Sequence, residues 1–260
     1  MNKIQLARIS LFPVKALSGV FVDSCAITSA GALFQDRQFA LKDGEGRLVN
    51  GKRHPEVNQI DASFDREQAT ITLDIYGFDD PQTFELRTDN DQLEEWFSDF
   101  FGFNIRLEEN TENGFPDDLR RPGPTVISTA TLNEVASWFP DLTIENLRQR
   151  FRTNLEIEGC PAFWEDQLNY VPDQGIRFQI GGVLFEGLKH CVRCPVPTQD
   201  TETGEVYTEF QNIFMRKREE TLPNWIKKSE FDHYYRLAIN TRIIDCNVEL
   251  ETGAKVELIP

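Results

Sequence analysis

Short strand-like runs dominate the first third of the chain and restrict it to a β-rich fold. In each run apolar and polar side chains alternate or β-branched residues recur, and Gly, Asp or Pro separates one run from the next. The runs span residues 4–12, 20–28, 37–42, 47–49, 57–64, 70–76 and 83–87. Strands this short and closely spaced predict a barrel or a sandwich rather than alternating strands and helices.

A helix and a polar stretch end this first part. Residues 91–101 place their apolar side chains on one helical face, behind an N-cap at Asp89 or Asn90, and the helix is expected to cover the barrel. The stretch 108–124 is rich in Gly, Pro and Asp and predicts a domain boundary. We therefore expect one domain at residues 1–115 and a second at 116–260.

The second half restarts the pattern. Strands are predicted at 125–128, 150–158, 176–180, 183–185, 235–244 and 255–259, with the pair around Gly181 and Gly182 forming a hairpin. Helices are predicted to open at Thr131, where Glu134 completes a capping box, and near Ile144. The chain is thus predicted to be mainly β, an α+β protein with two β-barrel-like domains and a few short helices.

Charge and cysteine usage exclude several classes of protein. A net charge of −16 repels phosphate backbones and anionic lipid, so neither nucleic acid nor a membrane is an expected partner. No run is long enough to span a membrane, and the first residues lack the apolar core of a signal peptide. Five scattered cysteines do not form a disulfide framework. A soluble, cytoplasmic protein is expected.

The stretch 187–204 concentrates the reactive chemistry of the chain. Cys191 and Cys194 flank Arg193, whose charge favours a thiolate, and the pattern suits a soft metal, a persulfide or a redox pair. One close cysteine pair cannot complete a tetrahedral zinc site, and Pro195 and Pro197 oppose the helix of a thioredoxin-type motif. An arbitrary cysteine is more often a small buried hydrophobe, but the charged neighbours weaken that interpretation here.

Basic residues at turns and strand ends form a second signal. In so acidic a chain they would converge on an anionic cofactor, although each alone is more often a solvated charge. They are Lys15, Arg37, Lys52, Arg53 and Arg152. No motif of a nucleotide-binding loop, a serine hydrolase or a zinc protease is present.

These residues together resemble the MOSC domain, which is named after the carboxyl-terminal part of molybdenum cofactor sulfurase. Cys191, Arg193 and Cys194, followed by Thr198, Asp200, Thr203 and Gly204, resemble its signature. The first half resembles the companion amino-terminal β-barrel domain, through Pro13, Val14 and Lys15, Gly19 and Val20, Asp36 and Arg37, and a basic residue before Pro55. The pairing is similar to the mitochondrial amidoxime-reducing components and their bacterial relatives.

The resemblance implies a site. Cys194 would bind molybdenum, with Cys191 nearby but not a ligand. Lys15, Arg37 and Arg152 would hold the phosphate of the molybdenum cofactor (Mo-molybdopterin), with Asn154 further along the same strand, and Asn240 would be a polar residue near the metal. Ala16 stands where the family often has serine, and Pro195 and Pro197 replace an aliphatic and threonine run. Pyridoxal phosphate is not expected.

The resemblance also implies a function. The chain would reduce small N-hydroxylated substrates, such as amidoximes and hydroxylamines, to amidines or amines. Electrons would come from a separate donor protein of the ferredoxin, flavodoxin or reductase type. The alternative is a carrier of the cofactor or a sulfur-transfer module without reductase activity. Candidate basic patches for the donor are Arg216, Lys217 and Arg218, or Arg120 and Arg121.

Overall fold

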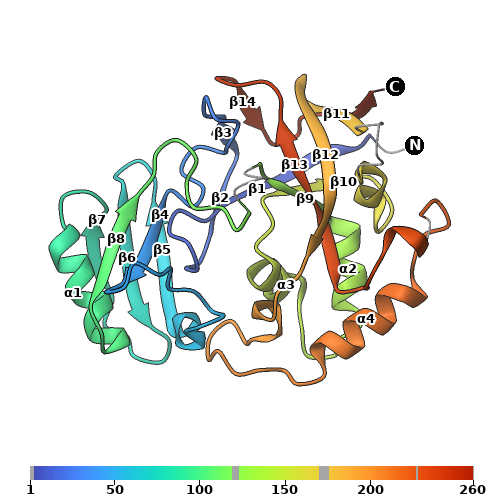
Figure 1. Ribbon diagram of the computed structural model, residues 1–260. Coiled ribbons are helices and arrows are strands. Elements are labelled where there is room, and N and C mark those ends of the chain that lie inside the picture. Colours follow the sequence, from blue (N-terminus) through green and yellow to red (C-terminus); the bar gives the residue numbers. More distant parts are fainter. Residues whose placement is uncertain (1–2, 119–122, 170–175, 227, 260) are drawn as a thin grey trace.

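The computed structural model describes residues 3–118, 123–169, 176–226 and 228–259, which form two lobes (Figure 1). The first lobe comprises β4 (Phe39–Asp43), β5 (Ile60–Asp65), β6 (Thr70–Ile75), β7 (Gln82–Glu85), α1 (Asn90–Phe101) and β8 (Ile105–Glu109). The second lobe is built on one large sheet with three further helices, α2 (Thr129–Ala136), α3 (Ile144–Phe151) and α4 (Phe210–Glu220). The predicted mainly β protein with a few helices is confirmed.

The large sheet has eight strands in the order β15-β11-β12-β13-β9-β10-β1-β2. They are β1 (Gln5–Leu11), β2 (Val20–Val22), β9 (Thr125–Ser128), β10 (Leu155–Glu158), β11 (Ile176–Ile180), β12 (Val183–Val192), β13 (Arg236–Ile243) and β15 (Val256–Ile259). β1 pairs with β10, with Ile9 opposite Leu155. The first residues of the chain are therefore part of the second lobe's sheet.

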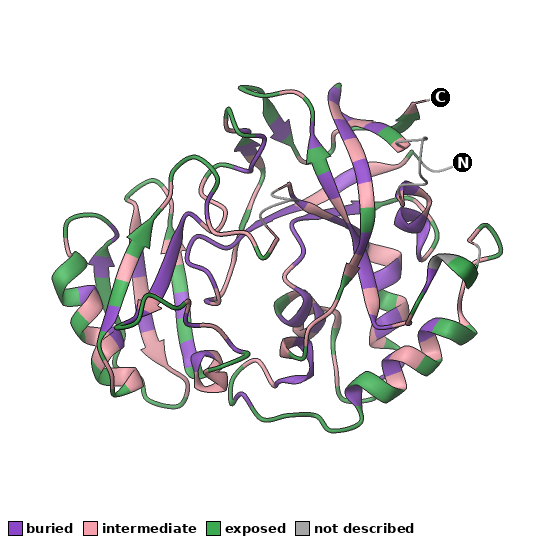
Figure 2. Ribbon diagram, viewed as in Figure 1, coloured by how far each residue is buried: buried purple, intermediate pink, exposed green. Residues whose placement is uncertain are grey.

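The central strands of the large sheet, β9, β10 and β13, are buried on both faces. Successive strand residues point to opposite faces, and Val126 belongs to one apolar cluster while Ile127 belongs to another. The second cluster also contains Leu132 of α2, Leu147 of α3 and Phe214 of α4. The three helices therefore cover this face, and buried residues concentrate between them and the strands (Figure 2).

The strands of the first lobe form two small separate sheets. β4 pairs with β8, and β5, β6 and β7 form a separate antiparallel sheet. A third apolar cluster, which includes Leu41, Leu73 and Phe97, lies inside this lobe. In the described part of the chain the named strands of these sheets do not pair into a ring. An antiparallel bridge between Gln5 and Lys255 nevertheless joins β1 to the residue before β15, so the eight-stranded sheet is closed only by this short contact.

Helix α1 forms where the apolar periodicity predicted it. Leu93 and Phe97 are buried one turn apart, and Gly102 ends the helix in the left-handed conformation (φ 74°). Asp89 is the N-cap residue, but its side chain accepts a bond from the Glu85 amide at 2.8 Å instead of capping the helix. Helix α2 begins earlier than expected, because Ser128 and not Thr131 supplies the capping oxygen.

The predicted strand at 150–158 is wrong in its first half. Helix α3 continues through Phe151, because Leu147 and Phe151 bury one helical face. Arg152 then ends the helix in the left-handed conformation (φ 50°), and β10 begins only at Leu155. Arg152 and Asn154 therefore lie on a helix-to-strand turn, not on one strand.

Several smaller differences concern the edges of the fold. Residues 47–49 form no strand, and part of 57–64 is a short 3₁₀ helix (Pro55–Gln59). The second predicted run is divided into β2 and β3 (Ser24–Ala26), while β8, β14 (Glu249–Glu251) and α4 were not predicted. No helix in the described residues is long and apolar enough to cross a membrane. The boundary between residues 115 and 116 stays a prediction.

Candidate functional site

The predicted β11–β12 hairpin is confirmed and presents both cysteines. Gly181 and Gly182, which both have positive φ, make its turn. Cys191 is the last residue but one of β12, and Cys194 lies just beyond the strand end. Both are half-buried free thiols. β12 pairs with β11 from Val183 to Gly187 and with β13 as far as Val192, so the cysteines lie where β12 ends beside β13.

Arg193 holds the cysteine segment in place. Its Nε and Nη2 donate to the Leu237 carbonyl oxygen at 3.0 and 2.7 Å, and its Nη1 donates to the Phe151 carbonyl oxygen at 3.0 Å. The Arg193 amide also donates to the Tyr235 carbonyl oxygen at 3.1 Å. The guanidinium therefore ties β12 to β13 and to the end of α3, which is a positioning role.

The polar turn after the cysteines joins the two lobes. Asp200 Oδ1 accepts from the amides of the second and third residues that follow it, both at 3.0 Å. Gly204 has φ +77°, and a Cβ there would lie 2.4 Å from the Pro55 carbonyl oxygen. Gln199 Nε2 donates to the Gly51 carbonyl oxygen at 2.7 Å. The signature residues thus bring the cysteine loop against the first lobe.

Arg37 and Arg152 converge on one aromatic ring. Their guanidinium carbons lie 4.9 and 4.2 Å from the centre of the Phe12 ring, and Arg37 Nη2 donates to the Arg152 carbonyl oxygen at 3.1 Å. Cation–π contact favours each guanidinium at this ring. Phe12 was not predicted as a site residue, because an apolar residue at a strand end carries no signal of such a role.

Arg152 is the least satisfied of these cations. Its Nη1 donates to the Leu17 carbonyl oxygen, whereas its buried Nη2 has no hydrogen-bond partner in the described residues. Burial and then the nearby charge of Arg37 lower the pKa of Arg152 to about 9. An anion at this position would satisfy Nη2 and offset the repulsion between the two arginines. The donor set therefore fits a phosphate.

Lys15 reaches the same region and is paired with a carboxylate. Its Nζ lies 2.6 Å from Asp117 Oδ1 and donates to the Phe115 carbonyl oxygen at 2.8 Å. Asp117 lines the cavity, and solvent still reaches 84% of its side chain. Partial removal from water would raise the pKa of Asp117, but the charges of Lys15 and Arg37 outweigh this and lower the pKa to about 2. Asp117 was not predicted as a site residue.

The two predicted asparagines are already engaged with the backbone. Asn154 Nδ2 donates to the Ser10 carbonyl oxygen at 3.1 Å, and its Oδ1 accepts from the Thr125 amide at 3.3 Å. Asn154 therefore braces β1 against β9. Asn240, on β13, donates from Nδ2 to the Lys189 carbonyl oxygen at 3.3 Å.

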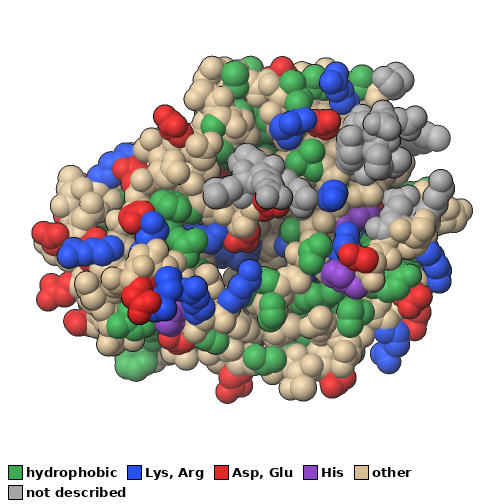
Figure 3. Space-filling view, in the orientation of Figure 1, with side chains coloured by type: hydrophobic (Ala, Val, Ile, Leu, Met, Phe, Trp, Pro, Cys, Tyr) green, Lys and Arg blue, Asp and Glu red, His purple; other side chains and the backbone are tan. Residues whose placement is uncertain are grey.

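One cavity of about 410 Å³ brings all six predicted site residues together. Its lining includes Cys194, Lys15, Arg37, Arg152, Asn154 and Asn240. Cys191 and Lys52 also line it, whereas Arg53 does not. Of the described residues that line it, six are basic and three are acidic, which is the reverse of the charge balance of the whole chain. Basic side chains gather around a hollow near the centre of the face in Figure 3. The volume and charge suit an anionic organic cofactor.

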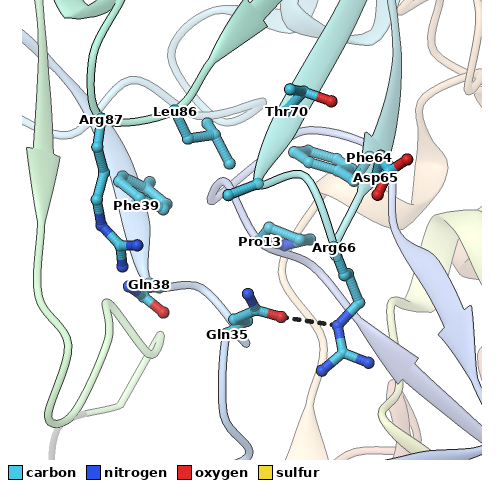
Figure 4. Close-up of a pocket in the computed structure, with 11 residues that line it drawn as sticks. Pro13, Gln35, Gln38, Phe39, Phe64, Asp65, Arg66, Thr70, Leu86 and Arg87 are labelled. Atoms are coloured by element: carbon cyan, nitrogen blue, oxygen red, sulfur yellow. Dashed lines mark hydrogen bonds between the residues drawn. The ribbon is translucent and has the colours of Figure 1, made fainter.

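A second cavity is too small for such a molecule. It measures about 20 Å³ and is lined by residues that include Pro13, Phe39 and Leu86, near a 2.7 Å hydrogen bond from Arg66 Nε to Gln35 Oε1 (Figure 4). A volume of this size holds about one water molecule. None of the six predicted site residues lines it.

The predicted basic patch on α4 is not a patch. Arg218 is fully buried, and its Nη2 donates to Asp166 Oδ2. Lys217 is paired with Glu220 at 3.0 Å, so only Arg216 remains exposed without a described partner. The error arose because sequence alone gave no sign that a buried carboxylate faces this helix. The other candidates, Arg120 and Arg121, lie outside the described residues.

Behind β12 lies a buried ionic cluster, which we define as Glu165, Asp166, His190 and Arg218. All four are almost fully excluded from solvent, and His190 Nε2 lies 3.2 Å from Asp166 Oδ1. Neither carboxylate oxygen of Glu165 has a hydrogen-bond partner in the described residues. Burial and then the charge of Asp166 raise the pKa of Glu165 from 4.5 to about 7.

This raised pKa predicts a pH-dependent stability. Between the unfolded pKa of 4.5 and the folded pKa of about 7 the folded state binds more protons, so stability falls as pH rises through this window. We expect Glu165→Gln to remove that contribution: its free energy of unfolding relative to wild type should be higher at pH 8 than at pH 5. Urea denaturation at both pH values measures the difference. An unchanged difference would contradict the prediction.

Comparisons with known proteins place this geometry in context. Residues 3–104 match the model of the MOSC N-terminal beta barrel domain, and residues 124–257 match the model of the MOSC domain. Mitochondrial amidoxime reducing component 2 of Bos taurus is 24% identical over 239 residues, covering 75% of this chain and 66% of the relative. Mitochondrial amidoxime-reducing component 1 of Mus musculus is also 24% identical, over 238 residues, covering 76% and 66%.

A second kind of relative is much longer. Molybdenum cofactor sulfurase of Oryza sativa subsp. japonica is 22% identical over 257 residues, which cover 79% of this chain and 30% of the relative. The chain thus spans about a third of the matched sulfurase and just under two thirds of the matched amidoxime-reducing components.

Proposed function

The chain belongs to the MOSC domain family, and from this premise we propose that it is a molybdenum-cofactor-dependent oxidoreductase that reduces N-hydroxylated compounds. The observation that carries the proposal is the single cavity that unites a half-buried thiol, Cys194, with the cluster of Lys15, Arg37 and Arg152. Relatives named as amidoxime-reducing components support the choice of substrate class.

Each site residue has a role in this proposal. Cys194 is the protein ligand of the metal, because a thiolate is a soft ligand suited to such a centre. Lys15, Arg37 and Arg152 hold the cofactor phosphate, and the unpartnered Nη2 of Arg152 is available for it. Asn154 braces the cavity wall, and Asn240 is the polar lining residue that would lie near the metal. When bound, the cofactor would supply two-electron oxygen-accepting chemistry.

The reaction balances with two electrons and two protons. The N–O bond of an amidoxime or hydroxylamine breaks, an amidine or amine forms, and the oxygen leaves as water. Electrons come from a separate protein of the ferredoxin, flavodoxin or reductase type, and the reaction is placed in the cytoplasm. His190 and Asp200 are near the cysteines in sequence, but neither lines the cavity, so neither is assigned as the proton donor.

Metal and pterin analysis tests the proposal. Protein purified from a host that makes the cofactor should contain molybdenum and pterin in about equal amounts and should reduce an arylamidoxime with dithionite as the electron source. Protein without molybdenum would refute the proposal.

A carrier or sulfur-transfer function is the alternative. It is favoured by Cys191, a second thiol on the same cavity, and by the relatives named as sulfurases. A carrier would contain the cofactor, release it readily to a recipient protein and show no turnover with the arylamidoxime. Turnover with dithionite therefore separates the two functions.

Asp117 is expected to compete with the cofactor phosphate for Lys15. The Asp117 carboxylate is ionised at neutral pH and forms an ion pair with the Lys15 ammonium at 2.6 Å. We expect Asp117→Asn to raise the affinity of the cofactor-free protein for inorganic phosphate about threefold to tenfold. Calorimetric titration measures this affinity.

The control is Asp118→Asn, which changes the net charge of the same cavity by the same amount. It should raise phosphate affinity less than Asp117→Asn does. Equal increases in the two variants would mean that only the summed charge matters, and would contradict a specific role of Asp117.

A further inference from the structure

The loop of Asn50, Gly51 and Lys52 in the first lobe forms part of the cavity lining, next to the segment that follows Cys194. Gln199 fixes it by donating to the Gly51 carbonyl oxygen at 2.7 Å. A Cβ on Gly51 would lie 2.9 Å from Gln199 Oε1 and 3.3 Å from Val196 Cγ1. The backbone of this loop therefore packs against Val196, only two residues after Cys194.

Lys52 is the cation that this loop adds to the cavity, and it differs from the cations at the Phe12 end. There Lys15 is paired with Asp117, Arg37 with Asp36, and Arg152 is bound to the backbone. The Lys52 side chain lines the same cavity and is exposed. Within the described part of the chain its ammonium has no hydrogen bond or ion pair. Its charge nevertheless reaches the cavity, because it contributes to the lowered pKa of Asp117.

We propose that Lys52 binds an anionic group of the substrate, so that the preferred substrates are N-hydroxylated compounds that also carry a carboxylate or phosphate. This inference rests on the proposed reductase function. The exposed Lys52 ammonium keeps most of its hydration when it meets an anion, and the excess of basic lining residues attracts anions to the cavity. The group of Lys15, Arg37 and Arg152 is left to the cofactor phosphate.

The test compares two probes that differ only in charge: an arylamidoxime and the same compound with a para-carboxylate. Wild type should prefer the carboxylate probe by about tenfold in kcat/KM. Lys52→Ala should lose that preference through a higher KM for the carboxylate probe, with molybdenum and pterin contents like those of wild type. Arg53→Ala is the matched control: it removes an adjacent exposed cation that does not line the cavity, and should keep the preference.

Four results would overturn the inference. A loss of pterin in Lys52→Ala would assign Lys52 to the cofactor. Equal effects on the two probes, or no effect, would remove its role in selectivity, and so would the same effect in Arg53→Ala. Calorimetric binding of both probes to the purified proteins reports the Lys52 contribution without turnover. Wild type that binds the carboxylate probe more tightly but turns over neither probe would therefore refute the reductase function and retain the anion site.

Discussion

Cys194→Ala is expected to lower the molybdenum content of the purified protein at least about tenfold and to abolish reduction of an arylamidoxime. The methyl group of alanine cannot replace a soft anionic ligand. The fold should tolerate the change, since Cys194 is a half-buried free thiol beyond the end of β12. Elemental analysis measures the metal, and fluorescence of the oxidised pterin measures the cofactor.

Cys191→Ala is the matched control. Cys191 lines the same cavity and is also a half-buried free thiol, so the geometry alone does not distinguish the two residues. The distinction rests on the family resemblance, in which the second cysteine binds the metal. Cys191→Ala should therefore retain most of the molybdenum. Loss of the metal from Cys191→Ala, or its retention in Cys194→Ala, would reverse the assignment.

Strands with clear alternation or clear turns could be predicted from the sequence. The strand at 125–128 and the hairpin that leads to Cys191 are observed where they were predicted. Helix α1 was found because its buried positions are all apolar. In these elements the local pattern and the tertiary environment agree, so the pattern is sufficient.

Helical segments with a charged residue on their buried face could not be predicted from the apolar pattern. Helix α4 buries Phe210, Phe214 and Arg218 at helical spacing, and because Arg218 is charged the pattern of apolar residues is incomplete. Arg150 does the same at the end of α3, where it is 6% exposed. Arg150, Phe151 and Arg152 alternate between charged and apolar residues, a pattern that also predicts a strand. The predicted strand therefore included Arg152, which lies in the turn before β10.

The candidate site required information beyond spacing. Lys15 and Arg37 are separated from Arg152 by more than a hundred residues, and only the fold brings the three cations to one cavity. The resemblance to the MOSC family had already predicted that these three cations act together. It did not supply Asp117 or the distinction between Lys52 and Arg53, because those depend on which side chains the cavity wall exposes.

Asp166→Ala is expected to have the largest effect on stability, about 3–5 kcal/mol in the free energy of unfolding. Asp166 accepts a bond from Arg218 Nη2 and lies 3.2 Å from His190 Nε2, and all three side chains are almost fully buried. Removing the carboxylate leaves a buried guanidinium without its counter-charge. Urea denaturation at pH 7 measures the loss.

Two further variants separate the loss of a buried charge from the loss of packing. Asp166→Leu combined with Arg218→Met should recover most of the stability, because an apolar pair needs no counter-charge. Lys217→Ala, which breaks a solvent-exposed pair with Glu220 on the same helix, should cost under about 1 kcal/mol. A loss in Asp166→Ala no larger than in Lys217→Ala would contradict the prediction.

The ionic cluster should also affect the metal site, because His190 directly precedes Cys191 on β12. Asp166→Ala should release molybdenum on milder heating than wild type, and the double variant should not.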